Sequence, residues 1–166
     1  MWTNFTRCSI IISKAGVIMN HPEKAEALFK DGFNCAQAVL IAFEDVTGLE
    51  RGSAARLASS FGGGLGRMRE VCGTVSGAAM VLGIAKGYSD PKAFDEKKAH
   101  YERVQEFAKR FKEQNGSIIC RELLSGSGAA EGTVPERRSP QYYKKRPCAE
   151  LCRRAAEILD QMLTEM

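Results

Sequence analysis

The stretch FGGGLGRMREVCGTVSGAAMVLG, residues 61–83, places seven glycines around one cysteine, Cys72. Inside a helix a glycine costs roughly 0.5–1 kcal/mol relative to alanine, so a cluster of glycines marks special turns or very close packing. We predict a helix over residues 69–86, in which Gly73 and Gly77 are four residues apart and share one face. These two glycines would let a neighbouring helix come unusually close, and the glycines before them would supply the turn that delivers Cys72.

Helical patterns separated by glycine fill most of the rest of the chain. Caps, apolar spacing and glycine stops predict helices over residues 21–30, 35–46, 52–60, 91–115 and 148–163, and a short helix holding Cys120. Residues 126–147 are rich in glycine, proline, serine and charge, and are predicted to form a long loop. Because no segment alternates like a strand, we expect an all-α fold, a single-domain helical bundle of about six helices with a glycine-rich connection before the Cys72 helix.

Length and composition exclude several classes of protein. The 166 residues suffice for one hydrophobic core, and we expect one domain over residues 19–166 after a flexible extension over residues 1–18. Hydrophobic residues make up 44% and charged residues 27%, a balance that excludes a disordered chain and a membrane protein. The formal charge of +4 comes with no nucleic-acid-binding motif, so nucleic acid is not an expected partner. No signal peptide or spanning segment is recognisable, which predicts a cytoplasmic protein and leaves Cys8 without a function.

The six cysteines are the strongest candidates for chemistry. In a reducing compartment such a set favours metal binding or redox chemistry over structural disulfides, although any one cysteine could simply pack as a small hydrophobe. Cys35, Cys120 and Cys148 fall in the first turns of predicted helices, where the positive end of the helix dipole lowers the pKa of a thiol. If the helices form a bundle, these thiols and Cys72 converge, where they could bind a soft metal ion or an iron–sulfur cluster, or exchange disulfides. No C-x-x-C pair is present, but Cys152 lies one turn after Cys148 and is close enough to be a joint ligand.

Three other patterns point to different chemistry. The glycine loop lacks the lysine–serine ending of a P-loop and a preceding strand, so a nucleotide site is not expected. A cysteine–histidine pair would need His21 or His100, and both are predicted to be solvated. The basic segment ERRSPQYYKKR, residues 136–146, could hold an acidic partner, which would make the protein a binding or structural module.

Four segments around the cysteines carry a resemblance to a known family: FNCAQAVL at Cys35, GGGLGRMREVCGTVSGA at Cys72, SIICRELL at Cys120 and RPCAELCRRAAEIL at Cys148. From about residue 20 to its end the chain resembles the C_GCAxxG_C_C family, which is named for this cysteine pattern. The resemblance implies that these four cysteines are the signature set. Thr74 stands where the family motif has alanine, whereas both motif glycines are in place.

The resemblance implies a helical fold and redox activity. Members of this family are often encoded near transporter genes, and the family resembles a domain of split-Soret cytochromes c. We expect an oxidoreductase or electron-transfer protein that uses clustered thiolates, with its catalytic or metal-ligating residues being Cys35, Cys72, Cys120 and Cys148. Gly73, Gly77 and Cys152, which lies outside the signature, are expected beside the cofactor. That cofactor would be an iron–sulfur cluster or a soft metal ion, or none if the thiols form reversible disulfides.

The expected partner is a redox partner or a transport-associated protein, with no nucleic acid and no membrane insertion, and a homodimer is left open. The alternative function is a metal-binding or structural interaction module associated with a transport system. Nothing in these residues names a substrate.

Overall fold

The computed structural model describes residues 11–12, 18–130 and 132–166, and its centre is one buried helix, α2 (Cys35–Ala42). Seven of the eight residues of α2 are apolar, and these seven are buried. The other helices of eight residues or more are α1 (His21–Lys30), α4 (Arg51–Ala58), α5 (Gly73–Lys86), α6 (Phe94–Asn115) and α9 (Cys148–Glu165). With six such helices in the described ranges, the predicted all-α fold is confirmed.

Shorter elements connect these helices. They are the helices α3 (Glu44–Thr47), α7 (Cys120–Leu123) and α8 (Pro140–Lys145), the 3-10 turn η1 (Ser59–Phe61), and two antiparallel two-residue strands, β1 (Ile11–Ile12) and β2 (Ile18–Met19). The predicted extension over residues 1–18, with Cys8, lies mostly outside the described residues.

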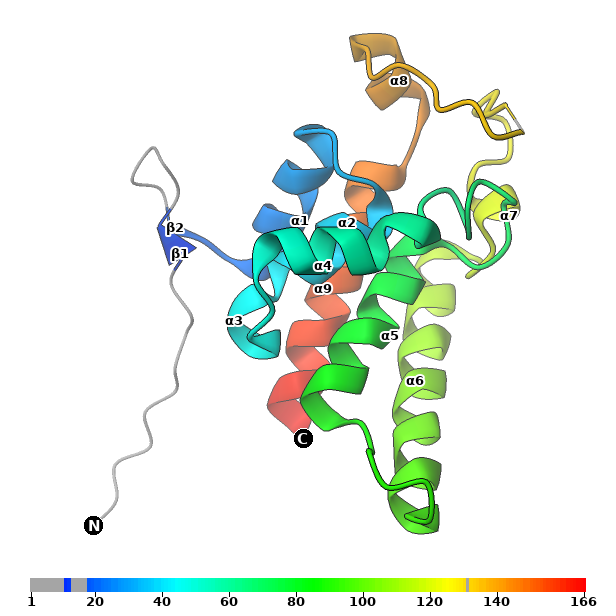
Figure 1. Cartoon of the computed structure of the whole chain (residues 1–166). Coiled ribbons are helices and arrows are strands. Elements are labelled where there is room, and N and C mark those ends of the chain that lie inside the picture. Colours follow the sequence, from blue (N-terminus) through cyan, green and yellow to red (C-terminus); the bar gives the residue numbers. More distant parts are fainter. Residues whose placement is uncertain (1–10, 13–17, 131) are drawn as a thin grey trace.

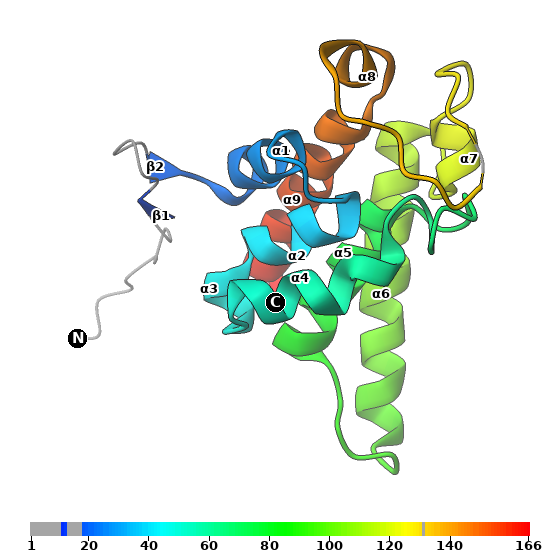
Figure 2. The same ribbon diagram turned by 45° about the horizontal axis from the view of Figure 1, so that its top comes forward.

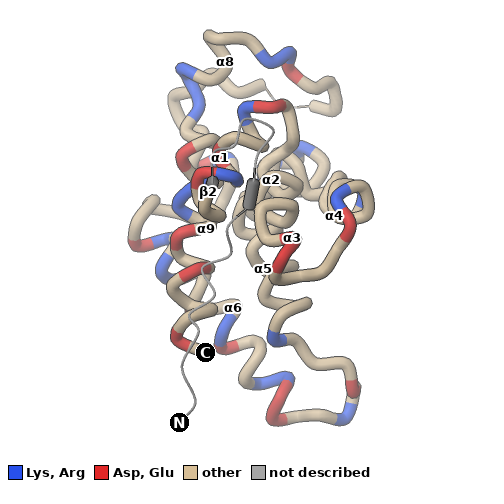
Figure 3. The backbone as a smooth tube through the Cα atoms, turned by 90° about the vertical axis from the view of Figure 1, so that its left-hand side faces the viewer, with Lys and Arg blue, Asp and Glu red and all other residues tan. Residues whose placement is uncertain are grey.

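The helices surround α2 in an arrangement that collects several helix starts at one end. Helices α1, α4, α5 and α9 contact α2, and α5, α6 and α9 contact one another along their lengths (Figure 1). The turned view shows α7 and α8 beyond the same end of the bundle, where α9 begins (Figure 2). Charged residues lie on the surrounding elements, whereas α2 carries none (Figure 3).

Local capping explains where the first helices begin. The side chains of Asn20 and Asn34 each accept a hydrogen bond from the backbone N–H three residues later. The side chain of that later residue, Glu23 or Gln37, in turn accepts a hydrogen bond from the backbone N–H of the asparagine. The starts predicted at His21 and Cys35 are therefore confirmed. α9 begins at Cys148, as predicted, directly after Pro147.

Gly73 and Gly77 allow α5 to lie against the backbone of α2. A Cβ atom on Gly77 would lie 2.7 Å from the carbonyl oxygen of Ala36, and one on Gly73 would lie 2.9 Å from the carbonyl oxygen of Phe61 and 3.1 Å from Cβ of Cys35. Real Cβ atoms do not come this close to backbone oxygen. The close helix approach predicted from this glycine spacing is confirmed.

Several predicted boundaries are wrong for identifiable reasons. The helix predicted from residue 69 begins at Gly73, because residues 70–72 pair with residues 118–120 and Val71, which is exposed, bridges Ile119. The second helix ends at Ala42 and is followed by the separate turn α3, which the left-handed Gly48 ends.

The predicted long loop and the predicted solvated histidine also need correction. Residues 126–147 contain α8, which Ser139 caps and which packs on α1 through the Tyr143 hydroxyl, a donor to the carbonyl of Lys30. His21 is largely buried: it stacks on Phe43 and its ring nitrogens contact carboxylates of α3 and α9.

Among the helices of the described residues, none combines the length and the hydrophobicity that a membrane-spanning segment needs.

Replacing Gly77 with alanine tests the contact between α5 and α2. We expect Gly77→Ala to lower the free energy of unfolding by about 1–3 kcal/mol, because the new methyl group meets backbone that cannot move aside. Gly83→Ala on the same helix is the matched control, since a Cβ there meets nothing within 4 Å and should raise the same quantity by about 0.5–1 kcal/mol. Equal urea midpoints for the two variants would contradict the close packing.

Candidate functional site

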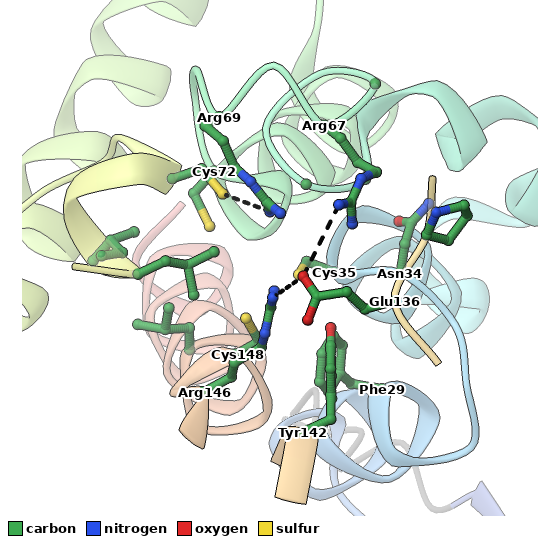
Figure 4. A pocket seen from close by; sticks show the side chains of 18 of the residues that line it. Phe29, Asn34, Cys35, Arg67, Arg69, Cys72, Glu136, Tyr142, Arg146 and Cys148 are labelled. Carbon is green, nitrogen blue, oxygen red and sulfur yellow. Dashed lines mark hydrogen bonds and ion pairs between the residues drawn. The ribbon is translucent and has the colours of Figure 1, made fainter. Parts of the chain in front are cut away.

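One cavity of about 320 Å³ lies where the starts of α2, α5, α7 and α9 meet. Its lining contains the four signature cysteines, which are between 4% and 8% exposed: Cys35, Cys72, Cys120 and Cys148. Figure 4 shows three of them around the cavity, together with charged side chains that face it. The structure thus brings together the four cysteines that the sequence singles out, from four separate segments.

Three other predicted site residues lie outside this lining. Gly73 and Gly77 face α2, and Cys152 is completely buried behind the cavity, where its thiol lies 3.9 Å from the carbonyl oxygen of Cys35. The part that these three residues play in holding a cofactor stays a prediction.

Cys35 and Cys148 are held by the two helices that they begin. Each is the first residue of its helix, and α2 and α9 pack against each other. The capping side chain of Asn34 also donates a hydrogen bond to the carbonyl of Ser59, 3.2 Å away, which ties the start of α2 to η1. Both cysteines are therefore fixed by helices that belong to the core.

Cys72 and Cys120 are held by a short antiparallel pairing. The backbone N–H of Cys72 donates to the carbonyl of Ile118 at 2.8 Å, and that of Cys120 donates to the carbonyl of Glu70 at 2.7 Å. A Cβ on Gly64 would lie 2.7 Å from Cβ of Cys120, so the glycine loop packs directly against this cysteine. Only glycine fits this position, which also has a φ of +71°.

The glycine loop has an unusual left-handed backbone. Five consecutive residues, 63–67, have positive φ, and three non-glycine residues in this loop share that conformation: Leu65, Arg67 and Arg69. Such a conformation costs about 1–2 kcal/mol for each non-glycine residue. Backbone hydrogen bonds within the loop, such as that from Arg69 N–H to the carbonyl of Gly63 at 3.1 Å, offset part of that cost. The loop sends the side chains of Arg67 and Arg69 into the cavity lining.

Among the described residues, four arginines and one carboxylate line the cavity: Arg67, Arg69, Arg138, Arg146 and Glu136. Glu136 forms an ion pair with the buried Arg146 and lies 3.9 Å from the guanidinium of Arg67, as the dashed lines in Figure 4 mark. Arg138 lies 4.3 Å from the ring centre of Phe29. Arg69 donates to the carbonyl of Ala130 at 2.6 Å and lies 3.9 Å from the thiol of Cys120.

These arginines are the site residues that sequence reasoning missed. Arg138 and Arg146 belong to the basic segment predicted as an outer contact surface, but both contribute to the cavity, and Arg146 is buried. Arg69 and Arg146 stand three and two residues before a signature cysteine, and this proximity is the one sequence signal that could have indicated them.

The pKa of every cysteine in the described residues is raised. Burial raises the pKa of Cys72 to about 12 and also raises the pKa values of Cys120 and Cys152. For Cys148 the main cause is its hydrogen bond to Cys35, followed by burial. A hydrogen bond from Cys148 lowers the pKa of Cys35, but the contact with Cys152 and burial outweigh it. The prediction that helix starts lower these pKa values is therefore wrong, because desolvation of closely spaced thiolates costs more than a helix dipole supplies.

The cysteines of the described residues are free thiols, and some of them are in contact with one another. All five cysteines in the described residues are unpaired, and Cys35 is in hydrogen-bonding contact with both Cys148 and Cys152. Thiols are the donors that soft metal ions and iron–sulfur clusters prefer. Within the described ranges, however, no three Cys, His, Asp or Glu side chains are placed to share a metal ion.

The sequence profile of one protein family, described as "Putative redox-active protein (C_GCAxxG_C_C)", matches residues 33–162. The match spans all four cysteines of the cavity. No curated protein and no solved structure matches the chain.

The raised pKa of Cys72 predicts how its reactivity changes with pH. Because only the thiolate is alkylated, a pKa of about 12 means that the rate in the folded protein rises about a hundredfold between pH 8 and pH 10. In urea-unfolded protein the pKa is near its ordinary value of about 8.5, so the rise is only about fourfold. The measurement is the iodoacetamide labelling rate of the tryptic peptide 70–86, and a rate that levels off near pH 9 in the folded protein would contradict the buried, neutral thiol.

Proposed function

The chain belongs to the C_GCAxxG_C_C family, and we propose that it is a thiol–disulfide redox protein in which Cys35 and Cys148 form the reactive pair. The observation that carries this proposal is that the two thiols line one cavity from the first residues of two packed helices, close enough for each to shift the pKa of the other. The family's description as redox-active agrees with such a reaction.

Helix packing supports the choice of this pair. Disulfide bonds need Cα atoms within about 4.4–6.8 Å of each other, which restricts the bond to residues on directly packed segments. Cys35 and Cys148 begin two helices that are in contact, α2 and α9. Forming the bond would therefore require little rearrangement of the core.

The opposite effects of this contact on the two pKa values indicate which thiol of the pair reacts first. The contact lowers the pKa of Cys35 and raises that of Cys148, so within the pair Cys35 loses its proton before Cys148 does. The Cys35 thiolate attacks one sulfur of an external disulfide, the bond between its sulfurs breaks, and one external thiolate leaves. That thiolate takes up a proton, and Cys148 loses its own proton and attacks the Cys35 sulfur.

The second attack completes a balanced exchange. A bond forms between the sulfurs of Cys35 and Cys148, and the remaining external thiolate leaves and is protonated. The protein loses two electrons and two protons, and the external disulfide gains them as two thiols. The same steps in reverse reduce the protein's disulfide.

Cys152 acts on the pair without belonging to it. It is fully buried, lies outside the cavity lining, and its contact with Cys35 raises the pKa of the Cys35 thiol. We propose that it limits the reactivity of Cys35, so replacing it with alanine should leave the disulfide able to form.

Peptide mapping of the oxidised protein tests the pairing. Cys148 and Cys152 fall in the same tryptic peptide, 146–153, so the experiment uses the Cys152→Ala variant and treats it with a thiol oxidant such as diamide. We expect the peptide 31–51, which holds Cys35, to be linked to the peptide 146–153, with the bond reversed by dithiothreitol. Cys35→Ser should abolish this product.

Two results would contradict the proposal. One is a folded protein whose Cys35 and Cys148 stay reduced under these conditions while the unfolded protein is oxidised. The other is stoichiometric iron or zinc in anaerobically purified protein that must be removed before either thiol reacts, which would make the cluster a metal centre. Cys120→Ser is the matched control, because it removes another thiol of the cavity and should leave the linkage in place.

A further inference from the structure

The cavity carries a surplus of positive charge. Among the described residues, four guanidinium groups and one carboxylate line it, and Glu136 is already paired with Arg146 and lies 3.9 Å from the guanidinium of Arg67. In the described part of the chain, backbone carbonyls and aromatic rings supply the other contacts that position these arginines: Arg67 donates to the carbonyl of Gly132 at 2.7 Å, and Arg138 lies between rings. Carbonyls orient a cation without neutralising it, so the cavity favours an anion.

Arg69 lacks a partner of opposite charge among the described residues. It is only 4% exposed, and its Nε atom is buried and has no hydrogen-bond partner within the described ranges. Among the described residues no carboxylate pairs with it; its terminal nitrogens contact the carbonyl of Ala130 and the thiol of Cys120. Leaving a buried donor of a charged group unpaired is costly, and an anion in the cavity would remove that cost.

Three helix N-termini add to this positive potential. The first residues of α2 and α9, Cys35 and Cys148, and the N-cap of α5, Cys72, all line the cavity. No side chain caps the starts of α5 or α9. The partial positive ends of three helices therefore face the same space as the arginines.

The size and the walls of the cavity limit what could enter it. A volume of about 320 Å³ lies at the lower end of the roughly 300–1,000 Å³ typical of small-molecule sites. Apolar side chains complete the lining, among them Phe29, Leu124, Tyr142 and Leu151. Such walls suit an organic molecule with an anionic end better than a bare inorganic ion.

We infer that the external disulfide is a small molecule bearing a carboxylate, which binds the guanidinium groups of Arg69 and Arg146 and so places its sulfurs beside Cys35 and Cys148. The reaction in this inference rests on the proposed function, whereas the binding of the carboxylate does not. A carboxylate on Arg69 would accept the bond that Nε lacks, and arginine binds carboxylates with two parallel hydrogen bonds. Because thiol–disulfide exchange is slow for buried, protonated thiols, holding the disulfide in place would raise its rate.

Binding is tested first, without any redox step. The probe is suberate, a dicarboxylate with the chain length of 3,3′-dithiodipropionate but with no sulfur, and amide shifts of the reduced protein report its binding. We expect saturable shifts around the cavity, and an affinity about tenfold lower for Arg69→Met, a loss of roughly 1.4 kcal/mol. Arg69→Lys should restore part of the binding. Arg137→Met is the control, because Arg137 is exposed, lies on the segment that holds Arg138 and Arg146, and does not line the cavity.

Reaction rates then test the substrate class. Three disulfides of similar size differ in charge: 3,3′-dithiodipropionate is anionic, bis(2-hydroxyethyl) disulfide is neutral and cystamine is cationic. Each rate of Cys35–Cys148 disulfide formation is divided by the rate at which the same reagent reacts with a free thiol in solution. We expect the anionic disulfide to be at least about tenfold faster than the cationic one, and Arg146→Met to reduce that ratio.

The outcomes separate this inference from the proposed function. Suberate binding that depends on Arg69, with no disulfide formed by any of the three reagents, would uphold the anion site and overturn the proposed reaction. Disulfide formation with equal normalised rates and no suberate binding would uphold the reaction and overturn the anion site. If Arg69→Met does not fold, Arg146→Met replaces it in the binding experiment, and unchanged suberate affinity in that variant would overturn the inference.

Discussion

The contact between α5 and α2 is the constraint on which the rest of the structure depends. Gly77 lets α5 lie against the carbonyl of Ala36, and Gly73 does the same beside Cys35. This contact helps to bury seven of the eight residues of α2 and places the start of α5 next to the start of α2. Once these two starts are together, the packing of α9 on both helices brings Cys148 to the same end of the bundle.

The site combines two costly features that only partly relieve each other. Buried thiols resist ionisation, and a buried guanidinium such as that of Arg69 lacks a carboxylate partner in the described chain. Near Cys120 the two features meet, because Arg69 lies 3.9 Å from the sulfur and favours its thiolate. Burial still prevails and keeps the thiol protonated, so the positive charge stays available for an anion from outside. The strained glycine loop holds Arg69 in this position.

Local signals in the sequence predicted much of the fold and the four cysteines that line the cavity. Asparagine caps set the starts of α1 and α2, and glycine spacing predicted the contact at Gly77, because each of these effects acts within one turn of chain or on one helix face. The arginines were not predicted, since the direction of Arg69 depends on a left-handed backbone and the burial of Arg146 depends on α8 folding back over α1. The pKa values of the cysteine thiols were predicted in the wrong direction. The position of a cysteine at a helix start can be read from the sequence, whereas its burial depends on how the whole molecule packs.

The central claim is that the thiols of Cys35 and Cys148 lie in contact in the reduced, folded protein. Cross-linking with dibromobimane, which joins two neighbouring thiols without a redox step, measures this most directly. In the Cys152→Ala variant the account predicts a fluorescent adduct that joins the tryptic peptides 31–51 and 146–153 in the folded protein and is lost in urea. Single labelling of these peptides, with no adduct between them, would contradict it.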